Sequence, residues 1–151
     1  MKLTEEPEVV HFPETQYVFV EKTGPFMESA PAAWQTAHPQ AAAVSANNKI
    51  TGYMSLYKRG PKVYRAGFSL ADAPQKLPEA LSYEKFPGGK YSRFVLTGPF
   101  SDLPAASGRV FEIVAEKGIK MREDFCIENY VTDPRTTPED QTITEILIPT
   151  E

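Results

Sequence analysis

LSYEKFPGGKYSRFVLTGPF, residues 81–100, contains two strand-like runs and ends where a helix is expected to begin. Aromatic and β-branched residues stand on both sides of Phe86-Pro87-Gly88-Gly89, which predicts strand, turn and strand. Residues 102–117 follow with apolar positions at helical spacing, and Gly118 is a candidate C-cap. Two more strands are expected at 124–131 and 142–149. The apolar positions of the expected helix are Leu103, Ala106, Val110, Ile113 and Val114.

The first half of the chain shows the same order of elements. A β-branched and aromatic run, QYVFV, precedes an alanine-rich stretch from Ser29 to Ala43 that favours helix, with Ser29 as the expected N-cap. His38-Pro39 is expected to divide this stretch, because the residue before proline avoids helical geometry. A hairpin of two strands follows. The expected strands of this half span residues 16–20, 50–57 and 63–70.

Both halves end their first strand in the same four residues. Thr23-Gly24-Pro25-Phe26 and Thr97-Gly98-Pro99-Phe100 each stand just before the expected helix. The sequence therefore predicts an α+β fold with two β-α-β-β units in a single domain, residues 1–151. Such a duplication implies an antiparallel sheet with both helices on one face. We expect a central ligand groove on the other face, at the pseudo-twofold axis.

Composition and charge limit the classes of partner. The chain has 151 residues, 41% of them apolar and 24% charged, and a net charge of −4. Its lysines and arginines are scattered, and only Lys58 and Arg59 are adjacent. Proteins that bind nucleic acids usually gather basic residues against the phosphates, so direct nucleic-acid binding is not expected.

Cysteine usage and the N-terminus favour a cytoplasmic protein. Cys126 is the one cysteine, which permits a reducing compartment, and the first residues lack the apolar core of a signal peptide. No run approaches the roughly 20 apolar residues of a membrane span. His11 and His38 have no spaced Cys or His companion, so neither a metal site nor a cofactor is expected. We expect a monomer.

Two glutamates in strand interiors are the candidate reactive groups. Alternation places Cys126, Glu128 and Tyr130 on one face of their strand. Glu145 lies in the last strand, and pairing of the two strands is expected to point both glutamates to the same side of the sheet. An anionic group among apolar side chains suits a lipophilic cation. It equally suits a general base or nucleophile, and a third alternative is a solvated face with no site at all.

Several segments together resemble a known family. They are KITGYMSLY, VYRAGF, FPGGKYSRFVLTGPF, CIENYVTDPRTTPED and TEILIP, which in this order resemble the GyrI-like small-molecule-binding family, also called the AraC-type effector-binding domain. The resemblance covers about residues 8–150. It implies the duplicated fold, related to the SOUL fold, with a central groove. Haem binding is not expected, because the two histidines lie outside the strands that should line the groove.

The resemblance also assigns roles to residues. It places Glu128 at the base of an aromatic pocket for hydrophobic or cationic, drug-like ligands, with Tyr130, Tyr53, Tyr57 and Trp34 as walls. Glu145 is a further candidate, and Leu147 stands where relatives often have an aromatic residue.

The resemblance leaves more than one activity open. A stand-alone small-molecule binder is the expected activity. One alternative is a hydrolase of electrophilic cyclopropanoid compounds, in which Glu128 is the general base and Tyr130 a second catalytic residue. Another is a protein that interacts with gyrase or with a regulator.

Overall fold

The computed structural model describes residues 1–151, which divide into two compact units. The central unit is the continuous segment Pro13–Gly88, and the terminal unit combines Met1–Phe12 with Gly89–Glu151. Each unit contains one copy of the predicted repeat, and each is described by itself below.

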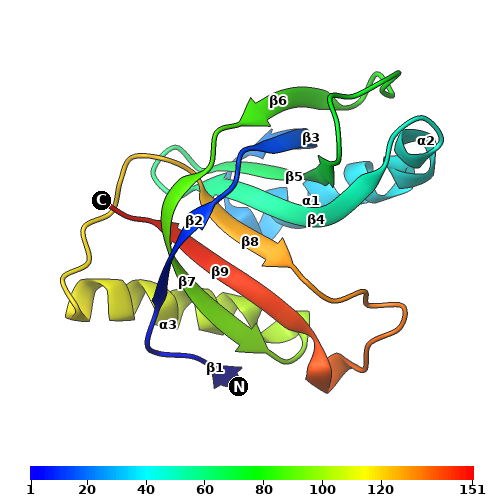
Figure 1. The fold of residues 1–151 in the computed structure, drawn as a ribbon. Helices are drawn as coiled ribbons and strands as arrows, with labels where there is room; N and C mark the ends of the chain where they lie inside the picture. Colours follow the sequence, from blue (N-terminus) through cyan, green and yellow to red (C-terminus); the bar gives the residue numbers. More distant parts are fainter. The chain divides into compact units, whose positions relative to one another are not determined.

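The central unit is an antiparallel sheet with its helices between the first and second strands of the repeat. The strand order within this unit is β4-β5-β3-β6, so the first and second strands of the repeat both pair with the third. Figure 1 shows these elements from blue to green. They are β3 (Thr15–Thr23), α1 (Phe26–Ala37), the 3-10 turn η1 (His38–Gln40), α2 (Ala41–Ser45), β4 (Ile50–Lys58), β5 (Val63–Leu70) and β6 (Ser82–Phe86).

Local sequence explains where the helices of this unit begin and end. Helix α1 starts directly after Gly24, whose φ of 119° reverses the chain, and Pro25 is its N-cap. The predicted N-cap at Ser29 is wrong: Ser29 lies inside the first turns, and its hydroxyl donates to the Gly24 carbonyl oxygen at 3.3 Å. The predicted break is confirmed, since α1 ends at Ala37 and His38-Pro39 forms a 3-10 turn, but the reason given for it is wrong, because His38 keeps helical backbone angles (φ −52°, ψ −46°).

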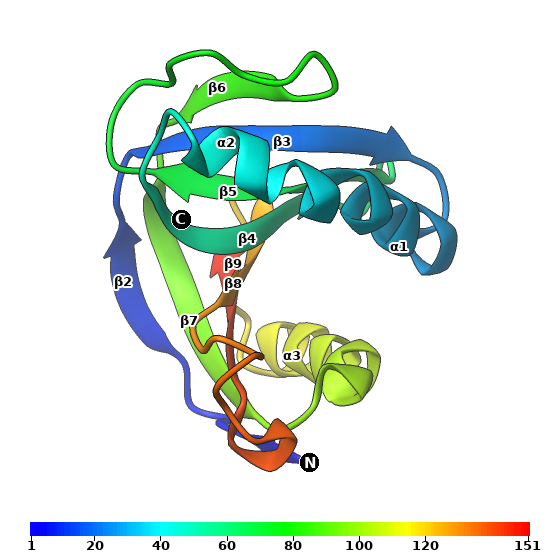
Figure 2. The same cartoon turned by 90° about the vertical axis from the view of Figure 1, so that its right-hand side faces the viewer.

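Helix α1 packs on one face of the central sheet, against β3 and β5 (Figure 2). Small residues on the helix, Ala33 and Ala37, are completely buried, so the helix can approach the sheet closely. The face below them consists of alternate positions of three strands, as the two-residue period of a strand requires. Its buried apolar members are Val18, Val20, Tyr57, Tyr64, Ala66 and Phe68.

The terminal unit repeats this arrangement. Its strand order is β7-β9-β8, and β1 and β2 both pair with the outer side of β7. Helix α3 packs against β7 (Figures 1 and 2). The elements are β1 (Lys2–Leu3), β2 (Glu8–Phe12), β7 (Gly89–Thr97), the 3-10 turn η2 (Phe100–Asp102), α3 (Leu103–Glu116), β8 (Cys126–Tyr130), the 3-10 turn η3 (Glu139–Gln141) and β9 (Ile143–Pro149).

The predicted duplication is confirmed. In each repeat the first and second strands both pair antiparallel with the third. The shared Thr-Gly-Pro-Phe motif ends the first strand in both, and Gly24 and Gly98 both have positive φ, 119° and 142°. The motif is thus a common device for turning the chain from strand to helix.

The strand β2 was not predicted, and its pairing is instructive. It precedes β3 along the chain but pairs with β7 in the terminal unit, where Val10 is opposite Tyr91. Likewise β6 precedes β7 but pairs with β3 in the central unit. Each repeat therefore receives as its outer strand the segment that leads into the other repeat, a long-range pairing that no local pattern indicates.

The helix α3 has the predicted apolar stripe and the predicted end. Ala106, Val110, Ile113 and Val114 are buried. Gly118 has φ of 64°, and the amides of Gly118 and Ile119 donate to the carbonyl oxygens of Ala115 and Val114. This pair of bonds is a Schellman C-cap. None of the three helices has the length and apolar character that crossing a membrane requires.

Candidate functional site

Glu128 lies on the helix-covered face of the terminal sheet. In the register of β8 with β9, Glu128 is opposite Ile146 and Tyr130 is opposite Thr144, so these four side chains share a face. The predicted grouping of Cys126, Glu128 and Tyr130 on one side of the strand is confirmed. Glu145 is opposite Asn129, one residue out of phase, so the prediction that both glutamates project to the same side is wrong.

A hydroxyl group holds the Glu128 carboxylate, and no basic side chain pairs with it. The Tyr130 hydroxyl donates to Glu128 Oε1 at 2.9 Å, and a side-chain hydrogen bond from Ser107, on α3, also lowers the pKa of the carboxyl. Part of the Glu128 side chain reaches solvent. The surrounding protein nevertheless displaces water from the carboxylate, and this is the largest single effect on its pKa. This desolvation raises the pKa of Glu128, and the two hydroxyl bonds only partly offset it.

An aromatic pair adjoins this carboxylate. Phe100, from the repeated motif, meets the Tyr130 ring edge-on with 5.6 Å between centroids. Phe100 is 41% exposed, so apolar surface beside the glutamate is open to solvent or to a ligand. The terminal unit thus combines a shielded negative charge with accessible aromatic carbon.

Glu145 has a different environment on the opposite face. Its carboxylate accepts from Arg93 Nη1 and from the Asn129 side-chain amide, both at 2.8 Å. An ion pair with a second hydrogen bond satisfies a part-buried carboxylate within the protein. We therefore assign Glu145 to the structure of the sheet and leave it out of the proposed ligand site.

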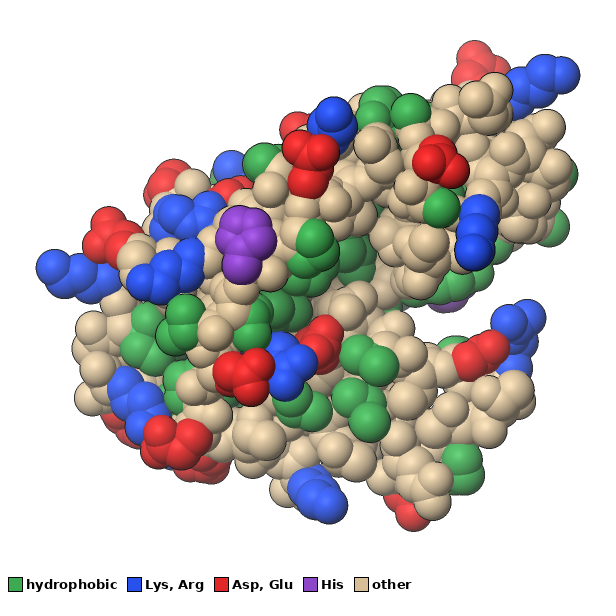
Figure 3. All heavy atoms as spheres, in the orientation of Figure 1, with side chains coloured by type: hydrophobic (Ala, Val, Ile, Leu, Met, Phe, Trp, Pro, Cys, Tyr) green, Lys and Arg blue, Asp and Glu red, His purple; other side chains and the backbone are tan.

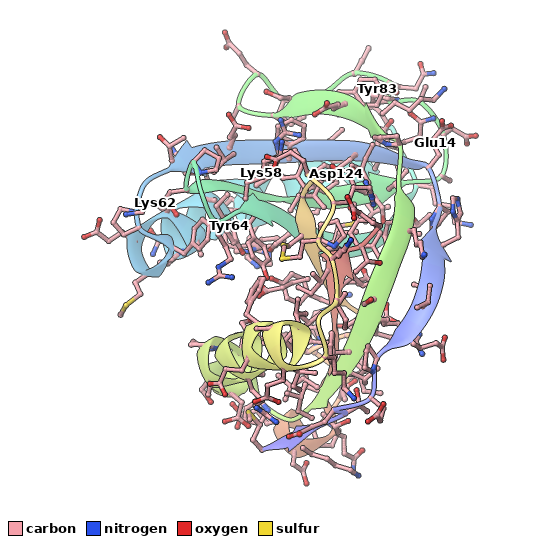
Figure 4. The ribbon with its side chains drawn as sticks, turned by 90° about the vertical axis from the view of Figure 1, so that its left-hand side faces the viewer. Glu14, Lys58, Lys62, Tyr64, Tyr83 and Asp124 are labelled. Atoms are coloured by element: carbon pink, nitrogen blue, oxygen red, sulfur yellow. The ribbon has the colours of Figure 1, made fainter.

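The central unit has a neutral polar cluster at the corresponding place. Trp34 Nε1, on α1, donates to the Tyr64 hydroxyl at 2.9 Å and to Ser55 Oγ at 3.3 Å. The Ser55 and Tyr64 hydroxyls are 2.6 Å apart, and both residues are buried. Figure 4 shows Tyr64 beside the β4-β5 turn, flanked by Lys58 and Lys62.

Aromatic rings surround this cluster. Trp34 lies 6.5 Å from Tyr53 and 4.6 Å from His38, centroid to centroid, with the three rings within 33° of parallel. Burial lowers the pKa of His38, which favours its neutral form. Tyr57 is 5% exposed and packs edge-on against Phe26, so it belongs to the core more than to an open surface.

Strand registers make Ser55 and Glu128 equivalent positions of the two repeats. Three residues before the shared threonine, Val20 is opposite Ala66, and Ala66 is opposite Ser55. In the terminal unit, three residues before the shared threonine, Phe94 is opposite Ile146, and Ile146 is opposite Glu128. In the central unit Trp34, on the helix, donates a hydrogen bond to this position, and in the terminal unit a side-chain hydrogen bond from Ser107, on α3, lowers the pKa of Glu128.

The family follows from a match over almost the whole chain. The profile of the GyrI-like small molecule binding domain matches residues 5–151. The chain belongs to the GyrI-like family. Among curated proteins, no match to this GyrI-like chain was found.

Solved structures share the GyrI-like fold at low sequence identity. The EcmrR C-terminal domain is 16% identical, with a TM-score of 0.80 over 100% of this chain and 99% of that one. SAV2435 bound to tetraphenylphosphonium is 13% identical, with a TM-score of 0.71 over 97% and 94% of the two chains. A hydrolase from Listeria innocua is 12% identical, with a TM-score of 0.63 over 98% and 93%. At these identities the likeness establishes the fold alone.

The structure places the predicted residues of this GyrI-like chain in two groups. Glu128 and Tyr130 are hydrogen-bonded neighbours in the terminal unit, and Trp34 stacks with Tyr53 in the central unit. Sequence reasoning missed Ser107, which adjoins the apolar stripe of α3 as its polar neighbour. It also missed Phe100, although the repeated motif contained it. Ser55, Tyr64 and His38 carried no local signal.

Proposed function

We propose that this GyrI-like chain binds lipophilic cations and that Glu128 is their anionic contact. The observation that supports this is a shielded carboxylate with hydroxyl donors but no counter-ion in the protein. Removing such a charge from water is costly unless an opposite charge approaches it. A cation with an apolar body supplies that charge and covers the aromatic surface at the same time.

Aromatic side chains in both units support the apolar part of the ligand class. Beside Glu128, Tyr130 and Phe100 offer ring faces and edges. In the central unit, Trp34 and Tyr53 are part-exposed and nearly parallel, 21° apart. Cations gain about 0.5–2 kcal/mol over such rings. We propose that Trp34 and Tyr53 are aromatic contacts that the central unit itself offers to such a cation and that Tyr57 supports them from the core.

The comparisons agree with this ligand class. The family is one of small-molecule-binding domains. One protein of the same fold, SAV2435, has been seen with tetraphenylphosphonium, a lipophilic cation. That ligand is therefore a reasonable first probe for this chain.

Calorimetric titration with tetraphenylphosphonium tests the proposal. We expect saturable binding by the wild-type protein and a loss of about a hundredfold or more in Glu128→Gln, since a close charge pair in a shielded site is worth several kcal/mol. Glu123→Gln is the matched control, because Glu123 is exposed and its loss changes net charge equally. Equal affinities of wild type and Glu128→Gln would refute the proposal.

Fluorescence gives a second measurement. Trp34 is the only tryptophan, so its emission reports on the central unit alone. Quenching of this emission by the cation would show that Trp34 and Tyr53 contact a bound cation. Binding in calorimetry without any change in Trp34 emission would exclude Trp34 and Tyr53 from the ligand site and leave Glu128 in place.

A hydrolase is the second candidate function. The Tyr130 hydroxyl, 2.9 Å from Glu128, would supply a proton donor beside a carboxylate whose raised pKa suits a general base. Incubation with an electrophilic cyclopropane and mass spectrometry would detect a ring-opened, hydrated product. We expect such product only if Glu128 and Tyr130 are both intact. Product that persists in Glu128→Gln would remove this mechanism.

A further inference from the structure

His38 adjoins the two aromatic side chains that the central unit offers to a cation. It opens the 3-10 turn η1 and follows Trp34 by four residues, so the two rings lie one helical turn apart on the same side of the helix. The His38 amide donates to the Trp34 carbonyl oxygen, and the backbone angles of His38 are helical. The local backbone therefore fixes the imidazole beside the indole.

Three rings form what we call the central aromatic cluster: Trp34, His38 and Tyr53. The imidazole lies 4.6 Å from the indole and 6.0 Å from the Tyr53 ring, centroid to centroid. Figure 2 shows the segment between α1 and α2 passing close to β4, the strand that carries Tyr53. Trp34 and Tyr53 are half-buried and His38 is exposed, so all three rings are open to a ligand.

Contacts on the buried side hold two of these rings in place. Trp34 Nε1 donates to the Tyr64 hydroxyl at 2.9 Å, and Phe68 meets the Tyr53 ring edge-on with 5.0 Å between centroids. Tyr64 and Phe68 are both buried. A cation with an apolar body would meet rings that need no reordering, which favours binding. His38 is the one member of the cluster that can itself become a cation.

The helices and strands around His38 bring no charged side chain to it. On α1 the charged residue is Glu28, in the first turn, whereas His38 follows the last turn, and α2 has none. On β4 it is Lys58, at the far end of the strand from Tyr53. On β5 it is Arg65, which pairs with two glutamates on the opposite face of the sheet. The titratable groups that β4 and β5 turn toward the helices are tyrosines, which carry no charge at neutral pH. They are Tyr53, Tyr57 and Tyr64.

This scarcity of charge is local. Acidic and basic side chains are interspersed over the face of the molecule in Figure 3. Around His38, burial is the effect that matters, and it lowers the pKa of the imidazole from its ordinary value of 6.5. The ring is therefore neutral at pH 7 and adds a third aromatic surface to the cluster. At lower pH it carries a positive charge 4.6 Å from the indole centroid, within the range of a cation–π contact.

We infer that His38 is a ligand contact of the central aromatic cluster and that its protonation excludes cations while neutral ligands still bind. The inference rests on the proposed contact of cations with Trp34 and Tyr53 and extends it to the residue that makes this contact depend on pH. The exclusion is reciprocal: a bound cation weakens proton binding by the same factor by which the proton weakens cation binding. A like charge within about 4–6 Å changes a pKa by about one unit, so this factor should be about tenfold.

The first experiment observes His38 directly. The carbon-bound imidazole protons of both histidines are followed by NMR against pH, with and without saturating methyltriphenylphosphonium. The cation should move the His38 midpoint downward by about one pH unit. His11, in β2 of the terminal unit, is the internal control. A His38 midpoint that stays in place in the saturated protein would overturn the inference.

The second experiment measures cation affinity through quenching of Trp34 emission at about pH 5 and about pH 8. His38→Phe keeps an aromatic ring and removes the charge. The affinity of His38→Phe relative to that of wild type should rise several-fold as the pH falls, because only wild type acquires the repelling charge. This ratio cancels the titration of Glu128, which both proteins share. His11→Phe makes the same change in the terminal unit and should follow wild type.

A neutral probe separates charge from folding. Triphenylphosphine oxide resembles methyltriphenylphosphonium in shape but is uncharged, and its affinity for wild type should not fall at the lower pH. Equal losses for the two probes would contradict the inference, since a general change of the fold would then explain both.

The outcomes keep the two proposals apart. If the cation leaves Trp34 emission unchanged at every pH, the proposed contact with Trp34 and Tyr53 fails and the inference fails with it. If the cation quenches this emission but the ratio of affinities is the same at both pH values, the inference fails while the proposed contact stands.

Discussion

The two repeats carry the same framework and differ in the polarity of one equivalent position. Ser55 in the central unit and Glu128 in the terminal unit occupy the same place in the strand registers. The first is completely buried and bonded to neutral partners, whereas the second is part-exposed and ionisable. The difference suggests that one copy of the duplicated unit keeps this position for stability and the other uses it for ligand chemistry.

Exposure explains why the repeats can differ here. A neutral serine satisfies its hydroxyl within a closed cluster of Trp34 and Tyr64. A glutamate in the same enclosure would lose its hydration without gaining a counter-ion. Glu128 avoids the full cost because Tyr130 and Ser107 donate to it and part of its side chain reaches solvent. The two repeats thus have the same backbone arrangement. They differ in the surroundings of the equivalent side chain, which are closed to water at Ser55 and partly open to it at Glu128.

The strongest test of this comparison transfers the charge. Ser55→Glu should lower the free energy of unfolding by about 3–5 kcal/mol, since an unpaired charge would enter a completely buried position. Urea denaturation measures the effect. Ser55→Ala is the control for loss of the hydroxyl, and it should cost only about 1–2 kcal/mol. A Ser55→Glu protein as stable as wild type would mean that the two positions differ less than their burial indicates.

Close strand packing is the second difference between the repeats. Gly67 on β5 corresponds to Leu147 on β9, because each is one residue beyond the aligned pair Ala66 and Ile146. A Cβ on Gly67 would overlap the Val18 carbonyl oxygen and lie 2.9 Å from Phe19 Cα. Only the central unit therefore requires glycine at this place.

Gly67→Ala should destabilise the protein by about 2–3 kcal/mol, because neighbouring backbone must move to admit the methyl group. Gly60→Ala is the matched control: nothing lies within 4 Å of a Cβ on Gly60, in an exposed turn. Its unfolding midpoint in urea should stay close to that of wild type. Equal midpoints for both variants would show that β3 and β5 can separate without cost.

A pair of buried tyrosines sharpens the comparison further. Tyr17 and Tyr91 are equivalent, completely buried residues, and each hydroxyl donates to a backbone carbonyl: Met54 at 2.9 Å and Phe125 at 2.8 Å. Removing the hydroxyl removes this bond to a buried carbonyl, at about 1–2 kcal/mol. Tyr17→Phe should cost more than Tyr91→Phe, because Met54 is 2% exposed whereas Phe125 is part-exposed and water can replace the lost bond. The reverse order of unfolding free energies would contradict this account.

Much of the fold could be predicted because its signals are local. Period-two alternation, the helical stripe of α3 and the repeated Thr-Gly-Pro-Phe motif each act within a few residues. The exchange of β2 and β6 between repeats depends on pairing across long stretches of chain, which local patterns do not encode. Ser29 resembled an N-cap, but the Gly24-Pro25 turn starts the helix four residues earlier, with Pro25 as the N-cap.

The candidate site was predictable to a smaller extent, for the same reason. Alternation correctly grouped Glu128 with Tyr130. It could not give the register of β8 against β9, so Glu145 was placed on the wrong face. Ser107 acts across a helix-sheet contact, and a serine in a helix has many ordinary explanations.

The smallest expected effect concerns the pH dependence of stability. Because burial raises the pKa of Glu128 in the folded protein, the folded state holds this proton more tightly than the unfolded state. The contribution of Glu128 to stability is therefore greatest below its unfolded pKa and declines as pH rises to the folded value. Glu128→Gln removes this titration and keeps an acceptor oxygen for Tyr130 or Ser107.

The difference between the unfolding free energies of wild type and Glu128→Gln should therefore depend on pH. It is measured in urea from about pH 4 to about pH 7. The variant should gain stability relative to wild type toward neutral pH, because the folded state of the wild-type protein resists ionisation of Glu128. Glu123→Gln, which removes an exposed carboxylate, is the matched control. A constant difference between wild type and Glu128→Gln would mean that the fold does not resist ionisation of Glu128. Ser55 and Glu128 would then differ only in the side chain that each position carries, and pH would affect stability at neither position.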